Sequence, residues 1–348
     1  FTVNVLIYLS IACVLFSCTQ RNPQRINSTV TQFPIDEMLT SEVVRVPPII
    51  ITPTFMFITG NHLVIQNNKK DTLFDIFSYP DIHYQFSAGT RGKGPKDFPE
   101  FLSGPTQIPN GFALFLVDYK KYCEIEIDDN NKELNRIKEQ RFQFAENDDI
   151  INGLFPLKRD EFIYLSDFED DMEFKKLNTR TNEIISFSPY PQWVSKESAG
   201  GEINISLYLK VSTAKPDGKR FASFYVKFKR WRLFNDNGDL LREVSVDTPP
   251  LNTEGTKSLE PYFYYSSYPF PTDKYIYAFC RNVKSGSADK ESNELQIWDW
   301  NGNPIAVYHL DQYITSFTVD EKAKTLFGVN NNEGSEGKIF KYSLPFLE

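Results

Sequence analysis

The feature of this sequence that most constrains its fold is a repeated unit of short apolar runs separated by polar turns. Turn residues recur near Pro80-Asp81, Asp129-Asn130, Thr179-Arg180, Asn237-Gly238 and Asn301-Gly302. Successive turns are 49 to 65 residues apart. Asn and Gly tolerate the positive φ that tight hairpin turns require. Regular units of this length are typical of the four-stranded blades of a β-propeller.

The segments between the turns have the composition of β-strands. The 348 residues include 30 Phe and 18 Tyr, and aromatic side chains favour strands. Alternation of apolar and polar residues is clearest in CEIEID at 123–128. No stretch keeps an amphipathic helical period for four turns, and residues 131–144 fit either a short helix or a charged edge strand. The sequence therefore predicts an all-β protein.

The two ends of the repeat predict how the ring closes. The last unit contains three strand-like runs, at 313–319, 325–330 and 338–344. A spare strand-like run, SEVVRV at 41–46, precedes the first unit. We therefore expect a six-bladed β-propeller over residues 41–348, in which the N-terminal strand completes the last blade and covers its edge.

The N-terminal residues predict export and lipidation. Residues 1–18 carry no charged side chain and are barely long enough to cross a bilayer, which favours a signal peptide over a membrane anchor. Their end, Leu15-Phe16-Ser17-Cys18, resembles the bacterial lipobox, although Phe16 is bulkier than usual there. We expect a lipoprotein signal peptide over 1–18, lipid on Cys18 and a flexible tether over 19–40. An uncleaved anchor and a conventional secretory signal are the alternatives.

The same segment begins with Phe rather than Met and lacks a basic leader, so we expect the true start to lie upstream. Processing would leave Cys123 and Cys280, each in an apolar run and 157 positions apart. We expect both to be buried small hydrophobic residues rather than a disulfide.

Charge limits the classes of partner. The net charge is −8 and the pI is about 5.2, which argues against a general affinity for nucleic-acid phosphates or an anionic bilayer. We therefore expect no nucleic-acid partner, and membrane contact through the lipid anchor only.

A glycine-rich stretch, SAGTRGKGPKDF at 87–98, could hold a phosphate or turn a corner. A phosphate loop needs a following helix whose N-terminal amides point at the anion. Prolines at 99 and 105 leave no helical run after it. We therefore expect the stretch to carry the chain from the first blade to the second, which it enters at 104–108.

Two segments carry a family resemblance. GTRGKGPKDF at 89–98 resembles the Gly-x-Gly-Pro-x-(Asp/Glu)-Phe signature between early blades of TolB-like six-bladed propellers, which are lipoproteins common in Bacteroidota. Residues 294–329 are similar to late blades of the same family. The resemblance implies a six-bladed propeller in the cell envelope and supplies no catalytic residues.

No residues are assigned to catalysis, to a cofactor or to a metal. His62, His83 and His309 have no partners at metal-ligand spacing. The acidic runs at 166–173 and 235–239 could supply oxygen ligands for calcium, but each falls where a hairpin turn is expected. Carboxylates from different blades could still converge at the central channel for glycoside chemistry, and sequence spacing does not reveal that.

The aromatic run EPYFYYSSYPFP at 260–271 is the strongest candidate for a ligand site. Its rings could lie on the propeller face and stack on a ligand, or they could pack between blades. The candidate ligand-binding residues are Tyr262, Tyr264, Tyr265, Tyr268 and, from the run at 189–193, Trp193.

These inferences lead to one principal function and two alternatives. We expect a binding or assembly module anchored by lipid, on the outer membrane facing the periplasm, with a protein or glycan ligand at the propeller face. An envelope hydrolase or lyase acting on glycans or peptides would instead gather several carboxylates in a concave pocket. A structural spacer would have a sealed channel.

Overall fold

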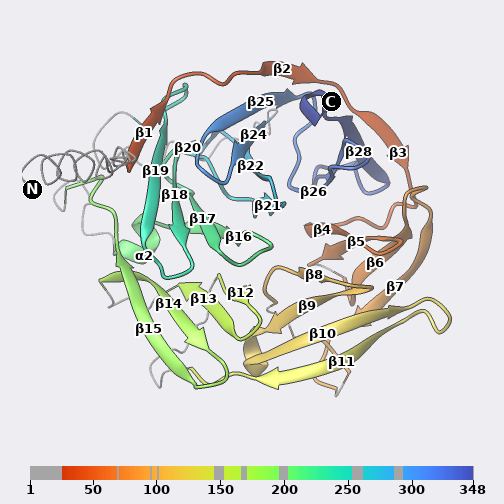
Figure 1. Cartoon of the computed structure of the whole chain (residues 1–348). Helices are drawn as coiled ribbons and strands as arrows, with labels where there is room; N and C mark the ends of the chain where they lie inside the picture. Colours follow the sequence, from red (N-terminus) through yellow and green to blue (C-terminus); the bar gives the residue numbers. More distant parts are fainter. Residues whose placement is uncertain are drawn as a thin grey trace, which may run out of the picture.

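The computed structural model describes residues 26–68, 70–94, 96–99, 102–144, 153–165, 171–195, 203–252, 262–285 and 293–347. Six antiparallel β-sheets surround a central axis (Figure 1), so the predicted six-bladed propeller is confirmed. No helix within the described ranges has the length and apolar content needed to span a bilayer.

Each blade runs from an innermost strand at the axis to an outer strand at the rim. Blade 1 consists of β4 (Pro53–Thr59), β5 (His62–Asn67), β6 (Thr72–Ser78) and β7 (Tyr84–Thr90). Blade 2 consists of β8 (Thr106–Ile108), β9 (Gly111–Leu116), β10 (Lys121–Asp128) and β11 (Glu133–Arg141). Blade 3 consists of β12 (Phe155–Lys158), β13 (Glu161–Leu165), β14 (Met172–Asn178) and β15 (Glu183–Pro189).

The second half of the ring repeats this order. Blade 4 consists of β16 (Lys210–Ala214), β17 (Arg220–Tyr225), β18 (Arg230–Asn235) and β19 (Leu240–Val246). Blade 5 consists of β21 (Phe270–Pro271), β22 (Tyr275–Cys280), β24 (Glu294–Asp299) and β25 (Pro304–Leu310). Blade 6 consists of β26 (Ser316–Asp320), β27 (Thr325–Val329), β28 (Lys338–Ser343) and the N-terminal β3 (Glu42–Arg45).

The N-terminal segment closes the ring as predicted and also adds strands to two other blades. Strand β3 pairs antiparallel with β28, with Val44 opposite Ile339, and so completes blade 6. Two earlier strands, β1 (Asn27–Val30) and β2 (Asp36–Leu39), add in parallel to the outer edges of blades 4 and 5. We call residues 26–45 the strap, since they run along the rim of three consecutive blades (Figure 1).

The strap corrects the expected tether. Residues 19–40 were expected to be flexible, but the part from 26 onward is paired and partly buried in the propeller. The amides of Glu243 and Val307 donate to the carbonyls of Ile26 and Ile35 at 2.7 and 2.8 Å. Phe33 is 7% exposed and packs edge-on against Trp298 with ring centroids 5.0 Å apart. Residues 1–25, including Cys18 and the expected signal peptide, lie outside the described residues.

The hydrophobic core lies between blades rather than inside any one of them. Successive side chains on a strand point to opposite faces of its sheet, so each strand contributes to two interfaces. In β13, Phe162 and Tyr164 pack towards blade 2, whereas Ile163 and Leu165 pack towards blade 4. Six clusters of buried residues, one at each blade-to-blade contact, follow from this alternation.

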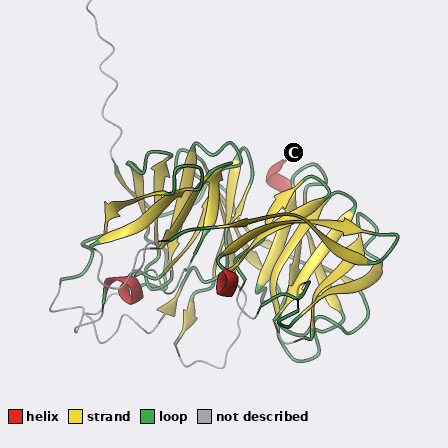
Figure 2. Cartoon of the chain, turned by 90° about the horizontal axis from the view of Figure 1, so that it is seen from below, coloured by secondary structure: helices red, strands yellow, loops and turns green. Residues whose placement is uncertain are grey.

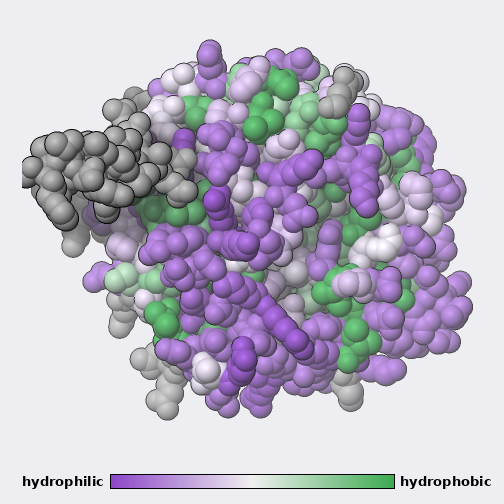
Figure 3. All heavy atoms as spheres, in the orientation of Figure 1, coloured by the Kyte–Doolittle hydropathy of each residue, from purple (hydrophilic) through white to green (hydrophobic). Residues whose placement is uncertain are grey.

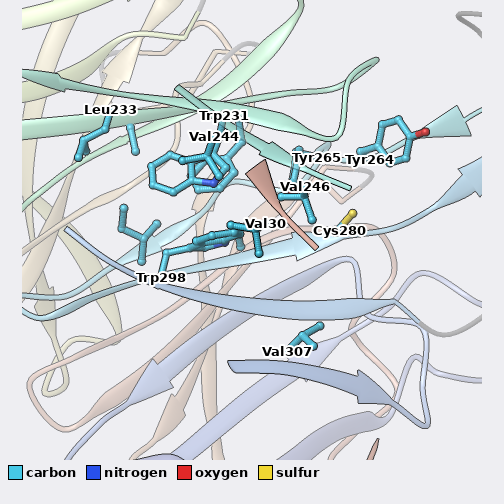
Figure 4. Packing of buried hydrophobic residues seen from close by; sticks show 14 of the residues in the cluster. Val30, Trp231, Leu233, Val244, Val246, Tyr264, Tyr265, Cys280, Trp298 and Val307 are labelled. Atoms are coloured by element: carbon cyan, nitrogen blue, oxygen red, sulfur yellow. The ribbon is translucent and has the colours of Figure 1, made fainter. Parts of the chain in front are cut away.

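The largest cluster joins blades 4 and 5. Trp231 and Trp298 are fully buried there, with ring centroids 5.2 Å apart. Figure 4 shows strap residue Val30 in the same cluster as these two tryptophans. Cys280 is also buried here, and Cys123 is buried between blades 1 and 2. Both thiols are free, as predicted.

The two faces of the propeller carry different connections. Because neighbouring strands are antiparallel, the connections from first to second and from third to fourth strand lie on one face. These are tight, and all five predicted turns join third and fourth strands on this face. The other face carries the long connections, including η1 (Val117–Tyr119), α2 (Asn204–Leu207) and the small sheet of β20 (Tyr262–Phe263) and β23 (Val283–Lys284).

Figure 2 shows the two internal short helices on one side of the ring and the C-terminal η3 (Pro345–Leu347) on the opposite side. The glycine-rich stretch belongs to the long-connection face, and it turns a corner as expected. It links β7 to β8, and the Gly94 N–H donates to Asp97 Oδ2 at 2.7 Å. Gly89 has φ +82°, and a Cβ there would lie 2.7 Å from the Phe74 ring.

Candidate functional site

A cavity of about 860 Å³ occupies the centre of the ring. The innermost strand of every blade, or the residues just before it, contributes to its wall. One lining residue from each blade in turn is Phe55, Thr106, Phe155, Ser212, Phe270 and Phe317. The central channel is therefore large enough to hold a small molecule. A structural spacer was expected to have a sealed channel, and this channel is not sealed.

The end of the channel at the long-connection face is aromatic. Tyr268 lies just before β21 and its ring is 44% exposed, with that exposure directed to the cavity it lines. The ring of Phe55 lies 4.9 Å from it, tilted by 43°. Phe55 fits there because Gly104 has no side chain, and a Cβ on Gly104 would lie 2.8 Å from the Phe55 ring. Desolvation by the surrounding wall raises the pKa of Tyr268, so its hydroxyl stays a neutral hydrogen-bonding group.

The opposite end of the channel is cationic. Lys158 is the last residue of β12, Arg159 follows it and Lys215 follows β16, so all three lie towards the tight-turn face. Lys158 Nζ is 2.7 Å from Asp236 Oδ2, and Lys215 Nζ is 2.5 Å from Asp217 Oδ2. Arg159 has no ion pair or hydrogen bond to any residue that the structure describes.

The cavity also extends outward between blades 2 and 3. Its wall there includes Tyr122 and Glu124 on β10, Lys138 on β11 and Phe162 on β13. Lys138 Nζ donates to Glu124 Oε1 at 2.7 Å. Glu124 is the single carboxylate among the described residues that line the cavity. The convergence of several carboxylates required by the hydrolase or lyase alternative is therefore not found in the described part of the wall.

Of the five aromatic candidates, Tyr268 lines the channel, and two others are corrected. Tyr264 and Tyr265 are each 1% exposed, so the expectation that they present rings on the propeller face is wrong. Tyr265 packs edge-on against Phe224 at 5.1 Å and its hydroxyl donates to Gln296 Oε1 at 2.8 Å. Packing between blades 4 and 5 therefore accounts for both side chains.

Tyr262 and Trp193 are half-buried, and neither is among the residues that line the cavity. Tyr262 lies in β20 beside the Tyr264 ring, with centroids 6.3 Å apart. Trp193 donates from Nε1 to Glu243 Oε1 at 2.8 Å, and the Arg232 guanidinium lies 5.5 Å from its ring centroid. Trp193 thus covers an ionic cluster between blades 3 and 4.

That ionic cluster is centred on Glu173, whose side chain is fully buried. Its carboxylate accepts from Lys210 Nζ at 2.9 Å, from the Tyr225 hydroxyl at 2.6 Å and from an Arg232 nitrogen at 3.1 Å. Burial lowers the pKa of Lys210, against the opposing effect of Glu173. None of the cluster lines the channel, and its satisfied geometry marks it as structural.

Candidate metal ligands do not gather in the described part of the chain. No three His, Cys, Asp or Glu side chains among those residues lie close enough together to hold an ion. The acidic run at 235–239 forms the β18–β19 turn, in which Asn235 Oδ1 accepts from the amides of Asn237 and Asp239 at 3.0 and 2.8 Å. Residues 166–170 of the other acidic run lie outside the described residues.

Sequence reasoning missed most of the channel wall. Phe55, Phe155, Phe317 and the cations Lys138, Lys158, Arg159 and Lys215 were not among the candidate site residues. The signal that could have found them is the repeat itself, because the first strand of each unit must line the axis of a propeller. Hydrophobic residues visible in Figure 3 form small, separate groups, so the concave channel is a better candidate site than that outer face.

Comparison with protein-family models gives no match, and no curated protein is similar in sequence. Among solved structures, a DUF4221-family protein from Bacteroides vulgatus superposes with a TM-score of 0.65 at 13% identity, covering 88% of this chain and 97% of that one. A Bacteroides fragilis protein named for its inferred export superposes with a TM-score of 0.53 at 10% identity, covering 91% and 98%. The chain is thus similar in fold to six-bladed propellers of Bacteroides.

Proposed function

We propose that this protein is a ligand-binding module of the bacterial cell envelope and that its ligand binds in the central channel against Tyr268. The observation that carries this proposal is the cavity of about 860 Å³ whose wall includes the exposed Tyr268–Phe55 ring pair. Small-molecule sites typically have volumes of roughly 300–1,000 Å³ and combine apolar walls with a few polar groups. Exposed rings left unpacked at such a site can stack on a sugar or an aromatic group.

The form of the cavity favours a small ligand or the end of a glycan over a folded protein. All six blades contribute to its wall, and its volume of about 860 Å³ suits a small molecule. A second protein could still contact the long connections around the mouth, where binding residues are commonly found. Binding without turnover is proposed because glycoside hydrolysis needs two carboxylates, and the described wall has Glu124 alone.

The location is part of the same proposal. The lipobox-like sequence ending at Cys18 supports lipidation there, and the fold similarity to the Bacteroides fragilis protein named for export is consistent with it. A lipid on Cys18 would hold the propeller at the outer membrane, facing the periplasm, through residues 19–25. Metabolic labelling with a palmitate analogue should mark the wild-type protein and should fail to mark a Cys18→Ala variant.

Binding is tested by screening the purified protein against a soluble glycan panel and against envelope extract. Tyr268→Ala should leave the Tm within about 2 °C of wild type, because the ring is exposed, and should weaken binding of any captured ligand at least tenfold. Tyr84→Ala is the matched control, since Tyr84 on β7 is 37% exposed and far from the channel wall. Equal binding by wild type and Tyr268→Ala would contradict the proposal.

A further inference from the structure

A half-buried arginine, Arg281, lies beside two residues of the channel wall. Arg281 follows β22, on the long-connection face where Tyr268 lies. One of its terminal nitrogens donates to Ser267 Oγ at 2.8 Å and to the Thr315 carbonyl at 3.4 Å. Both Ser267 and Thr315 line the cavity. The guanidinium charge is therefore one side chain away from the channel.

Unlike Lys210, Lys229 and Arg232, Arg281 has no carboxylate partner among the described residues. Lys210 and Arg232 both contact Glu173, and Lys229 Nζ lies 3.6 Å from Glu294 Oε2. Arg281 instead has the two neutral acceptors and the Tyr313 ring, whose centroid is 5.6 Å away. Its Nε is buried and has no hydrogen-bond partner in the described structure. Burial accordingly lowers the pKa of Arg281.

A cation with no opposite charge beside it is costly to desolvate and is normally retained where an anion can meet it. Most cations of the channel wall are already paired: Lys138 with Glu124, Lys158 with Asp236 and Lys215 with Asp217. Among the described residues, Arg281 has no carboxylate partner. It therefore supplies an available positive charge at the end of the channel where Tyr268 lies.

We propose that the ligand of the channel is an organic anion that carries a ring, with its acid group attracted by Arg281 and its ring stacked on Tyr268. The inference rests on the proposed binding function of the channel and names the chemical class of the ligand. Carboxylates, sulfonates and phosphates all pair strongly with a guanidinium in a partly desolvated site. A sugar acid and an aromatic acid both satisfy these requirements, because either ring has a face that can lie on a tyrosine.

The charge requirement is tested with two fluorescent probes that differ by one group. 8-Anilinonaphthalene-1-sulfonate is an anion with aromatic rings, and N-phenyl-1-naphthylamine is its neutral counterpart. Titration of the full-length protein should show the anionic probe binding at least tenfold more tightly. Equal affinities with Tyr268-dependent binding would overturn the anion assignment and leave the binding function standing. Failure of both probes to bind would overturn both proposals.

Variants of Arg281 test whether this side chain supplies the charge that attracts the anionic probe. Arg281→Gln should remove most of the preference for the anionic probe, whereas Arg281→Lys, which keeps the charge, should retain most of it. Arg45→Gln is the matched control, because Arg45 is exposed on β3 at the rim. If Arg281→Gln does not fold, two other results test the proposal. The wild-type protein should bind the anionic probe more tightly than the neutral one, and Tyr268→Ala should bind neither probe. An unchanged preference in folded Arg281→Gln would overturn the assignment.

Competition experiments then test whether the ring of the ligand is a sugar or an aromatic ring. Glucuronate is compared with glucose, and benzoate with benzyl alcohol, as displacers of the anionic probe. At least one acid should displace the probe at a tenfold lower concentration than its neutral partner does. A difference between glucuronate and glucose would indicate a sugar ring, and a difference between benzoate and benzyl alcohol would indicate an aromatic ring. Displacement by neither acid, or equally by acid and neutral partner in both pairs, would contradict the proposal.

Discussion

Blades 4, 5 and 6 each carry a strand of the strap on the rim, whereas β7, β11 and β15 of blades 1, 2 and 3 have no added neighbour among the described residues. The strap pairs with β19, β25 and β28 in turn. The ring therefore has a strapped half and a bare half. The cavity extends outward between two bare blades, so this extension lies away from the strands that the strap covers.

The bare outer edges have features that oppose unwanted strand pairing. Strand β11 is the charged edge strand that the sequence of 131–144 allowed, and its residues include Arg136, Lys138 and Glu139. A β-bulge between Glu124 and Ile125 interrupts its register with β10. Charged side chains and bulges are common ways to protect an exposed edge. Register shifts also occur beside the strap-covered strands β19 and β25, so the charged side chains of β11 are the feature particular to that bare edge.

The interfaces between blades also differ in what packs at them. Blades 4 and 5 meet through Trp231 and Trp298, with strap residue Phe33 packed on Trp298. Blades 3 and 4 meet partly through the buried Glu173 cluster. Blades 2 and 3 meet beside the open cavity. The largest apolar cluster therefore lies in the strapped half, away from the extension of the cavity between blades 2 and 3.

The largest effect should come from removing the strap. A chain beginning at residue 47 lacks β1, β2 and β3, which leaves blade 6 one strand short and exposes the edges of β19 and β25. We expect loss of a cooperative thermal transition and association in size-exclusion chromatography, because the exposed edges template pairing. A chain beginning at residue 26 is the control. A chain from residue 47 that melts within a few degrees of the control would show that the strap is dispensable.

The second prediction compares one substitution in the two halves. Phe224→Ala removes a fully buried ring stacked on Trp231 at 5.1 Å, and should lower the free energy of unfolding by about 4–5 kcal/mol. Phe162→Ala removes a ring that borders the cavity, and should lower it by about 3 kcal/mol, since fewer atoms surround that site. Chemical denaturation measures both. Equal decreases in the free energy of unfolding would contradict the expected difference between the two interfaces.

The third prediction concerns the ionic interface. Glu173→Gln leaves Lys210 and Arg232 without their shared carboxylate, so the free energy of unfolding should fall by about 3 kcal/mol. Replacing the pair together, as Glu173→Leu with Lys210→Met, should recover part of that loss, because no unpaired Lys210 charge remains. Urea denaturation of the single and double variants provides the measurement. A double variant less stable than Glu173→Gln would argue against this account of the cluster.

The smallest expected effect lies at the seam between blades 6 and 1. Tyr79 donates its hydroxyl to Asp320 Oδ2 at 2.5 Å. Burial raises the pKa of Asp320, but hydrogen bonds from Tyr79 and from the amides of Ala323 and Lys322 outweigh it, and the net pKa lies below the ordinary value of 3.8. The carboxylate thus stabilises the fold above that value and stops doing so as the pH falls through the lower folded-state pKa.

Asp320→Asn should therefore lower the free energy of unfolding by about 1 kcal/mol or less at pH 7. The difference from wild type should shrink as the pH falls below 3.8 and the wild-type carboxyl becomes protonated. Thermal melts at a series of pH values check the trend. A difference that grows as the pH falls would contradict the direction of the shift.

Much of the fold was accessible from the sequence because its signals are local. The five polar turns each close a hairpin, and the spare strand at 41–46 completes blade 6. Strands β1 and β2 were missed because each has four residues, of which Val30 and Leu39 alone are buried. So short a segment shows no alternation, and its partner strands lie more than 200 positions away.

The candidate site was less accessible, because channel lining depends on where each strand lies relative to the axis. The aromatic run at 260–271 contains Tyr268, which lines the cavity, and its role in binding stays a prediction. Tyr264 and Tyr265 do not present rings on the propeller face, since the interface of blades 4 and 5 buries them. The partner ring of Phe55 and the half-buried Arg281 come from other parts of the chain, and no sequence spacing connects them to Tyr268.

Hydrogen–deuterium exchange on the free protein tests the contrast between the two halves most directly. The amides of Glu243, Asp247 and Val307 donate to strap carbonyls, so the outer strands β19 and β25 should exchange slowly. Strands β7, β11 and β15 have one free edge in the described structure and should exchange markedly faster. Equal exchange rates at the rims of all six blades would contradict a ring that is strapped on one side and bare on the other.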